Sequence, residues 1–189
     1  MRSLFLLLLF GLTFARAHAA TVSIYFDAAG TQSTRSIQGN QPFDFYVVAR
    51  DIDDGMLAFE ICVVAPDGLS ILSSEFHPRV AHSTPGQTCP TPVLDSCVAV
   101  GASMWLIKFH AIYDRLPPPA DDLVCVWALP TSPFPKMGSY LNCARVDQPL
   151  EFAPITGTDY PAGCGVLNPT QRVEVENKAA TVGRVKAGY

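Results

Sequence analysis

The chain has 189 residues, of which 49% are hydrophobic and 16% charged, with 13 Lys and Arg against 17 Asp and Glu. This acidic balance, without a basic cluster to offset it, excludes a nucleic-acid partner, because the phosphate backbone would be repelled. Charged residues are too few for an acidic disordered chain, so we expect a folded protein.

The first 19 residues have the pattern of a signal peptide. Arg2 gives a basic start, residues 4–10 are an apolar run, and residues 17–19 form the small-x-small motif that precedes a cleavage site. The run is too short to span a bilayer, and no later run is long enough. We therefore expect a cleaved signal helix at 1–19 and a mature chain that has no stable membrane span and is secreted, periplasmic or at the cell surface. Loss of Arg2 and Arg16 leaves 11 basic residues against 17 acidic ones, a formal net charge of −6.

Hydrophobic residues recur with a period of two along the mature chain, which is typical of β-strands. Period-two strands are expected at residues 21–27, 43–50, 57–64 and 105–114, an apolar strand at 123–129, and weaker strands at 150–153 and 172–176. In the longest of these, Trp105 is assigned to the core face with Ile107 and Phe109. No helix is expected in the mature chain, except in the last dozen residues.

Turn-forming residues separate the predicted strands. The turn signals lie at residues 27–30, 39–42, 53–55, 66–68, 85–86, 117–119 and 158–163. Six or more short strands without a helical pattern between them predict one all-β domain, an antiparallel β-sandwich at 20–176. A tail follows at 177–189. Two segments rich in Pro, Ser and Thr, 77–95 and 131–139, are expected to be long loops.

All six cysteines lie after the leader. They are Cys62, Cys89, Cys97, Cys125, Cys143 and Cys164. In an oxidising compartment this even number predicts three disulfides that staple the sandwich. A Cys89–Cys97 link is favoured because the two residues bracket a short loop stiffened by proline, and the pairing of the other four stays open. The absence of a Cys-x-x-Cys pair argues against a zinc site.

An acidic segment is a candidate calcium site. Asp51, Asp53 and Asp54 precede Gly55, and a hard cation prefers several oxygen ligands from a tight acidic loop. The spacing does not fit an EF-hand, because Gly and the downstream Glu60 fall at the fifth and tenth positions of the loop and not at the sixth and twelfth. The alternative is a solvated turn between two strands. We expect no cofactor, and calcium is the alternative.

No catalytic motif is found. Ser103, His110 and Asp114 could be drawn as a triad, but the sequence has no G-x-S-x-G turn to hold a nucleophile. An unrecognised secreted hydrolase stays an alternative. Trp127 is a candidate for stacking against a sugar, although packing in the core is the favoured interpretation for both Trp105 and Trp127.

Three short motifs give a resemblance to a known set of proteins. The mature chain opens with Y-F-D-A-A-G at 25–30, carries the Cys89–Cys97 segment in its middle, and ends with T-V-G-R-V-K-A-G-Y at 181–189. In these features it resembles uncharacterised exported bacterial proteins that have a Y-F-D-x-x-G start and a T-W-G-x-V-K-x-L-Y tail. Val182 and Gly188 replace the Trp and Leu of that tail. The resemblance implies a cohesin-like or immunoglobulin-like sandwich and no particular activity.

These observations favour a non-enzymatic binding or structural module at the cell surface, with an unknown protein or glycan as its partner. A secreted carbohydrate-binding or calcium-binding module is the first alternative, and the hydrolase is the second.

Overall fold

The computed structural model describes residues 20–82, 89–101, 103–114, 117–130, 132–134 and 136–170. All regular secondary structure in these ranges is β-strand. None of these residues forms a helix long and apolar enough to cross a membrane. The thirteen strands are β1 (Thr21–Tyr25), β2 (Thr34–Arg35), β3 (Pro42–Arg50), β4 (Ile52–Glu60), β5 (Cys62–Val64), β6 (Leu69–Phe76), β7 (Val80–His82), β8 (Val93–Val100), β9 (Met104–Tyr113), β10 (Asp122–Trp127), β11 (Gly138–Leu141), β12 (Asp147–Phe152) and β13 (Cys164–Leu167). The predicted leader, the strand at 172–176 and the tail at 177–189 lie outside the described residues.

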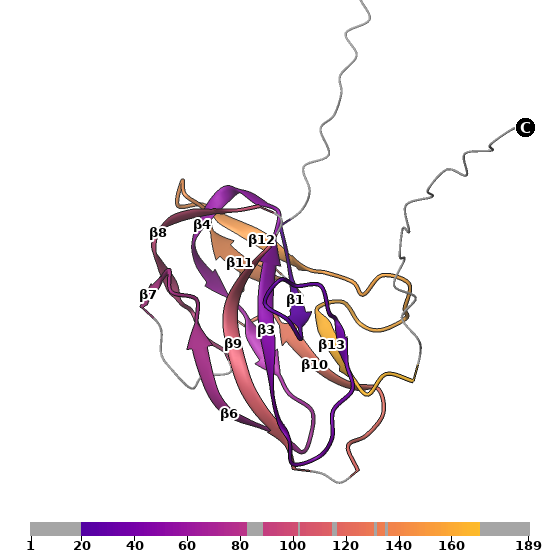
Figure 1. Cartoon of the computed structure of the whole chain (residues 1–189). Coiled ribbons are helices and arrows are strands. Elements are labelled where there is room, and N and C mark those ends of the chain that lie inside the picture. Colours follow the sequence, from indigo (N-terminus) through magenta and orange to yellow (C-terminus); the bar gives the residue numbers. More distant parts are fainter. Residues whose placement is uncertain are drawn as a thin grey trace, which may run out of the picture.

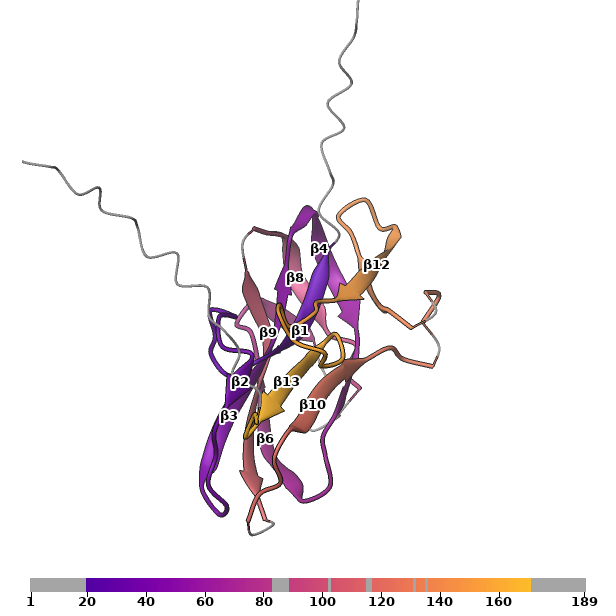
Figure 2. The same cartoon turned by 90° about the vertical axis from the view of Figure 1, so that its right-hand side faces the viewer.

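The strands form two sheets (Figure 1). The larger has the order β6-β9-β3-β1-β12-β11-β4-β8-β7, and the smaller has the order β2-β13-β10-β5. In the larger sheet β12 pairs in parallel with β1 and antiparallel with β11, so the sheet passes from one layer of the sandwich to the other at β12. The smaller sheet extends the second layer, because β10 and β13 both pack on β1 (Figure 2).

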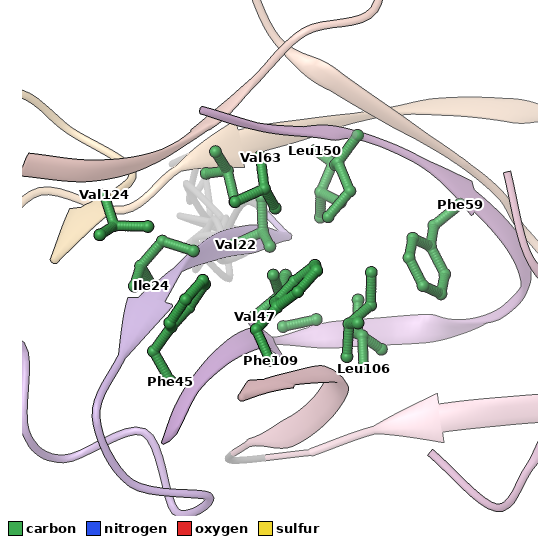
Figure 3. Packing of buried hydrophobic residues seen from close by; sticks show 14 of the residues in the cluster. Val22, Ile24, Phe45, Val47, Phe59, Val63, Leu106, Phe109, Val124 and Leu150 are labelled. Carbon is green, nitrogen blue, oxygen red and sulfur yellow. The ribbon is translucent and has the colours of Figure 1, made fainter. Parts of the chain in front are cut away.

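The core fills the space between these layers. On the first layer Ile24, Phe45 and Phe109 point inward, and the Phe45 and Phe109 rings stack with their centroids 5.0 Å apart. The opposing layer contributes the buried side chains of Phe59, Val63, Val124 and Leu150 (Figure 3). Each large apolar side chain that is fully buried in this way stabilises the fold by about 1.5–3 kcal/mol. The predicted all-β sandwich is therefore confirmed.

The predicted strands at 21–27, 43–50, 105–114 and 123–129 correspond to β1, β3, β9 and β10. The predicted turn at 53–55 is wrong, because these residues belong to β4. Asp51, with φ 57°, lies between β3 and β4, and Gly55, with φ 74°, occupies an irregular stretch of the β4–β8 pairing between Ile52 and Met56. Glycine here serves a bulge inside a strand, which the sequence pattern does not distinguish from a turn.

The two predicted long loops are shorter than expected. Residues 77–95 include β7 and the start of β8, and residues 131–139 include the start of β11. β6 was not predicted at all. Its pairing with β9 shifts between Ile71 and Ser73, and this bulge breaks the alternation of apolar and polar residues that would have revealed a strand.

The three predicted disulfides are present, but the predicted Cys89–Cys97 pairing is wrong. The pairs are Cys62–Cys89, Cys97–Cys143 and Cys125–Cys164, and the chain has no free cysteine. Residues 93–97 lie in the extended strand β8, which carries Cys97 about 13 Å along from the end of the preceding loop. The short sequence separation therefore does not bring Cys97 back to Cys89.

The Cys97–Cys143 disulfide crosses a strand. It joins Cys97 of β8 to Cys143, the second residue after β11, and β4 lies between these two strands. Gly55 of β4 lies directly beneath the two sulfur atoms, and a Cβ atom at this position would collide with both. Glycine is thus required here both by its positive φ and by the disulfide above it.

Candidate functional site

The acidic segment at the start of β4 is part of a hydrogen-bonded structure. Tyr140 donates its hydroxyl hydrogen to Asp54 Oδ1 at 2.7 Å, and Asn142 Nδ2 donates to Asp54 Oδ2 at 2.8 Å. Burial and the hydrogen bond to Asp54 both raise the pKa of Tyr140, so this hydroxyl stays protonated as a donor. Asp54 therefore fixes the hairpin between β11 and β12.

Asp51, Asp53 and Asp54 do not converge. Among the described residues no group of three His, Cys, Asp or Glu side chains is placed to hold a metal ion, and both oxygens of Asp54 already accept hydrogen bonds. Calcium binding at this segment stays a prediction that the arrangement of these three carboxylates does not favour.

His110 and Asp114, which were considered for a catalytic triad, have hydrogen-bond partners outside it. His110 Nδ1 is 2.8 Å from Asp44 Oδ1, whereas Asp114 accepts a hydrogen bond from Ser70. Ser103 is an exposed residue just before β9 and has none of these contacts. Because a nucleophile must contact its base, this arrangement does not support hydrolytic chemistry at these residues.

Trp127 lies at the surface, so the expectation that it packs in the core is wrong. It is the last residue of β10 and is 62% exposed, whereas Val124 and Val126 of the same strand are buried in the core. Alternation along the strand explains the difference, because Trp127 points to the opposite side of the sheet from those two valines. In the described ranges it is the only aromatic side chain that is mainly exposed.

Trp127 belongs to a continuous set of uncharged side chains. Val64 of β5 is 52% exposed and is paired with Cys125 of β10. Cys62, also on β5, is paired with Trp127. Residues that are directly opposite in an antiparallel pair share a face, so these side chains all point to the outer side of the smaller sheet, where Val64 and Trp127 are exposed and Cys62 is covered at 6% exposure. We call the outward positions of β5 and β10 the uncharged face; they are Cys62, Val64, Leu123, Cys125 and Trp127.

Two disulfides hold the strands of the uncharged face. Cys62 is bonded to Cys89, and Cys125 is bonded to Cys164, which lies opposite it on β13. Both cross-links are made from outward positions, so β5 is tied to the segment before β8 and β10 is tied to β13. The apolar side chains between them are therefore presented on a rigid surface.

Sequence reasoning selected Trp127 as a candidate ligand-binding residue but missed Val64. The alternation at 57–64 places Val64 on the same side as Cys62 and opposite to Ile61 and Val63, which was enough to mark it as outward. The pairing of β5 with β10 is not visible in the sequence, because nothing local links two strands about 60 residues apart.

Trp105 is also misassigned to the core. It is half-buried and contacts Tyr46 and His77, with ring centroids 6.3 Å and 4.9 Å away. The register of β3 and β9 shifts so that Val47 pairs with Ile107 and Val48 pairs with Trp105. The extra residue, Leu106, points inward together with Ile107, and Trp105 is turned to the outer face.

No family model and no curated protein sequence matches the chain. Several solved structures have a similar fold. CaCohA2 of Clostridium acetobutylicum, solved in a two-protein complex, has a TM-score of 0.56 at 9% identity and covers 80% of this chain and 100% of its own. A cohesin–dockerin complex from Clostridium thermocellum gives a TM-score of 0.51 at 8% identity, with 80% and 99% covered.

A third similar structure is the sixth cohesin of scaffoldin B from Acetivibrio cellulolyticus, solved in complex with a dockerin. Its TM-score is 0.50 at 11% identity, and the match covers 80% of this chain and 99% of the cohesin. At such low identity the likeness establishes the fold and leaves the resemblance to exported bacterial proteins untested. Of the two sandwich types that the sequence suggested, the chain has the cohesin-like one.

Proposed function

We propose that this chain is an exported, non-enzymatic module that binds a partner protein on the uncharged face, with Trp127 as the anchoring side chain. The observation that carries the proposal is the exposure of Trp127, at 62%, beside Val64 on a face whose outward positions carry no charge. Exposed apolar patches mark interaction sites, and Val64 and Trp127 are the two exposed apolar side chains of this one.

The chemistry of the uncharged face suits protein binding. Trp is among the residue types that contribute most to protein interfaces, because it buries a large apolar surface with few rotatable bonds. A partner that covers this face would not have to remove water from any charged side chain, because the outward positions of β5 and β10 carry none. The two disulfides further favour binding, since a rigid surface loses less conformational entropy on association.

The similar structures support a protein partner by analogy of fold. Two of the cohesins above were solved in complexes with dockerins, which are proteins. This analogy concerns the class of partner and does not select a particular one. Three disulfides also support an extracytoplasmic location, because disulfides persist in oxidising compartments. The division into a leader at 1–19, a sandwich at 20–176 and a tail at 177–189 is part of this proposal.

The proposal can be tested by site-specific photo-crosslinking. A photoreactive amino acid at position 64 is exposed to the secreted and envelope proteins of the organism that exports the chain, and position 72, an exposed leucine on β6, serves as the matched control. We expect a discrete crosslinked protein from position 64 only, and we expect Trp127→Ala to abolish it. The same crosslinks from both positions, or crosslinks that persist in Trp127→Ala, would contradict the proposal.

A further inference from the structure

A second surface of the molecule, remote from the uncharged face, is lined by aromatic side chains. It is the outer face of β1, β3 and β9, on the far side of the core from β10 (Figures 1 and 2), which is the sheet neighbour of β5. Across these strands Tyr25 pairs with Tyr46, Tyr46 pairs with Lys108, and Lys108 pairs with Glu75 of β6. One row of outward side chains therefore crosses four strands.

The ring contacts of this face form two groups, and the pairing of Tyr25 with Tyr46 places these groups side by side. The Arg50 guanidinium lies 4.8 Å from the centroid of the Tyr25 ring, Trp105 contacts Tyr46 at 6.3 Å, and His77 contacts Trp105 at 4.9 Å. We call Tyr25, Tyr46, Trp105 and His77, with Arg50 at one end, the aromatic strip. Tyr46, Trp105 and His77 are half-buried, so each of these rings keeps part of its surface in contact with water, whereas Tyr25 is only 9% exposed.

Polar side chains with free hydrogen-bonding capacity lie along the strip. Asp44 accepts from Lys108 Nζ at 3.1 Å and has His110 Nδ1 at 2.8 Å. A carboxylate can accept about four hydrogen bonds and an ammonium can donate about three, so Asp44 and Lys108 both keep unused positions. His110 pairs with Asp44 on one side and with Ser73 of β6 on the other, so Ser73 adds a hydroxyl to the row that contains Asp44.

Charge on this face is balanced, unlike that of the whole chain. Among the outward positions of β1, β3, β9 and β6, Arg50 and Lys108 offset Asp44 and Glu75, whereas the chain as a whole has a formal net charge of −4. Burial and the nearby Arg79 lower the pKa of His77, which favours the neutral form of its ring. A ligand with a net charge of either sign would therefore gain little here and would lie beside a like charge.

We infer that the aromatic strip binds an uncharged oligosaccharide. The C–H faces of pyranose rings are apolar and pack on aromatic side chains, while their hydroxyl groups both donate and accept hydrogen bonds, as Asp44, Lys108 and Ser73 require of a ligand. The strip crosses several strands, so it offers contacts to successive sugar units of a chain. This inference does not depend on the uncharged face or on a protein partner.

Tryptophan fluorescence provides the test, because the chain has only two tryptophans, Trp105 and Trp127. Trp127→Phe in the mature protein leaves Trp105 as the single reporter. The probes are neutral hexasaccharides of β-1,4-glucose, β-1,3-glucose, β-1,4-xylose, β-1,4-mannose and β-1,4-N-acetylglucosamine. We expect at least one to shift the Trp105 emission to shorter wavelength in a saturable manner, because a bound sugar displaces water from the ring.

Variants then assign the site. Calorimetric titration with the binding sugar should show affinity reduced about tenfold or more in Trp105→Ala and in Tyr46→Ala, and unchanged in Trp127→Ala. Thermal unfolding of each variant confirms that it is folded. The inference is overturned if none of the five sugars shifts the Trp105 emission, if folded Trp105→Ala binds as tightly as the parent, or if Trp105→Ala loses capture of a protein instead.

Discussion

The two tryptophans lie on opposite outer faces of one sandwich, and their surroundings differ in almost every respect. Trp127 stands on an uncharged face that two disulfides cross-link, and it is mainly exposed. Trp105 is half-buried between Tyr46 and His77, on a face that an ion pair and ring contacts hold together. The uncharged face suits a partner that excludes water entirely, whereas the aromatic strip suits a ligand rich in hydroxyl groups.

The largest effect we expect concerns the bulge that turns Trp105 outward. Leu106 is fully buried, although strict alternation with Ile107 and Phe109 would place it on the surface. Leu106→Ala should therefore lower the free energy of unfolding by about 2–5 kcal/mol, as measured by urea denaturation. A loss below about 0.5 kcal/mol, typical of a surface site, would mean that the bulge is absent and that Trp105 faces the core.

The next effect concerns the cross-link of the uncharged face. Replacing Cys125 and Cys164 together by serine removes the disulfide between β10 and β13, which closes a segment of 39 residues. We expect a loss of about 2–4 kcal/mol in the free energy of unfolding. Amide hydrogen exchange should rise in β10 and remain unchanged in β3. Equal increases in both strands would show that the two faces are not independently held.

A direct comparison of the tryptophans should separate burial from exposure. Trp105→Ala removes two ring contacts and should cost about 1 kcal/mol. Trp127→Ala removes an exposed side chain and should change stability by less than about 0.5 kcal/mol. Thermal denaturation of the two variants side by side measures the difference. A reversed order would contradict the assignment of both surroundings.

The smallest effect concerns the ion pair beside the aromatic strip. Burial by itself would raise the pKa of Asp44, but the hydrogen bonds from His110 and Lys108 outweigh it and hold this pKa below its usual value. Because the folded-state pKa is lowered, the stabilisation is present above the unfolded value of about 3.9 and is lost as pH falls through the folded pKa.

Asp44→Asn should accordingly cost about 0.2–1 kcal/mol at pH 7, since the group is partly exposed. The difference between the variant and the parent should vanish when both are unfolded by urea at a pH well below 3.9. A difference that is independent of pH would show that Asp44 acts through packing and not through its charge. Glu151→Gln, at an exposed site on β12, is the matched control.

Period-two patterning was sufficient to predict the fold class and the strands β1, β3, β9 and β10, because each buries one face in the core. It failed where a bulge adds a residue, at Leu106 and between Ile71 and Ser73, since one inserted residue exchanges the faces of everything beyond it. It also could not pair Cys62 with Cys89 or set β5 beside β10. Those contacts depend on how distant strands meet, and no local property of the chain determines that.

The two faces are proposed to bind different ligands through different tryptophans. The most direct measurement compares Trp105→Ala and Trp127→Ala in two assays, photo-crosslinking from position 64 and titration with the binding hexasaccharide. We predict that Trp127→Ala loses only the crosslinked protein and that Trp105→Ala loses only the sugar. If either variant lost both activities, or if each lost the other's, the division of binding between the two faces would be contradicted.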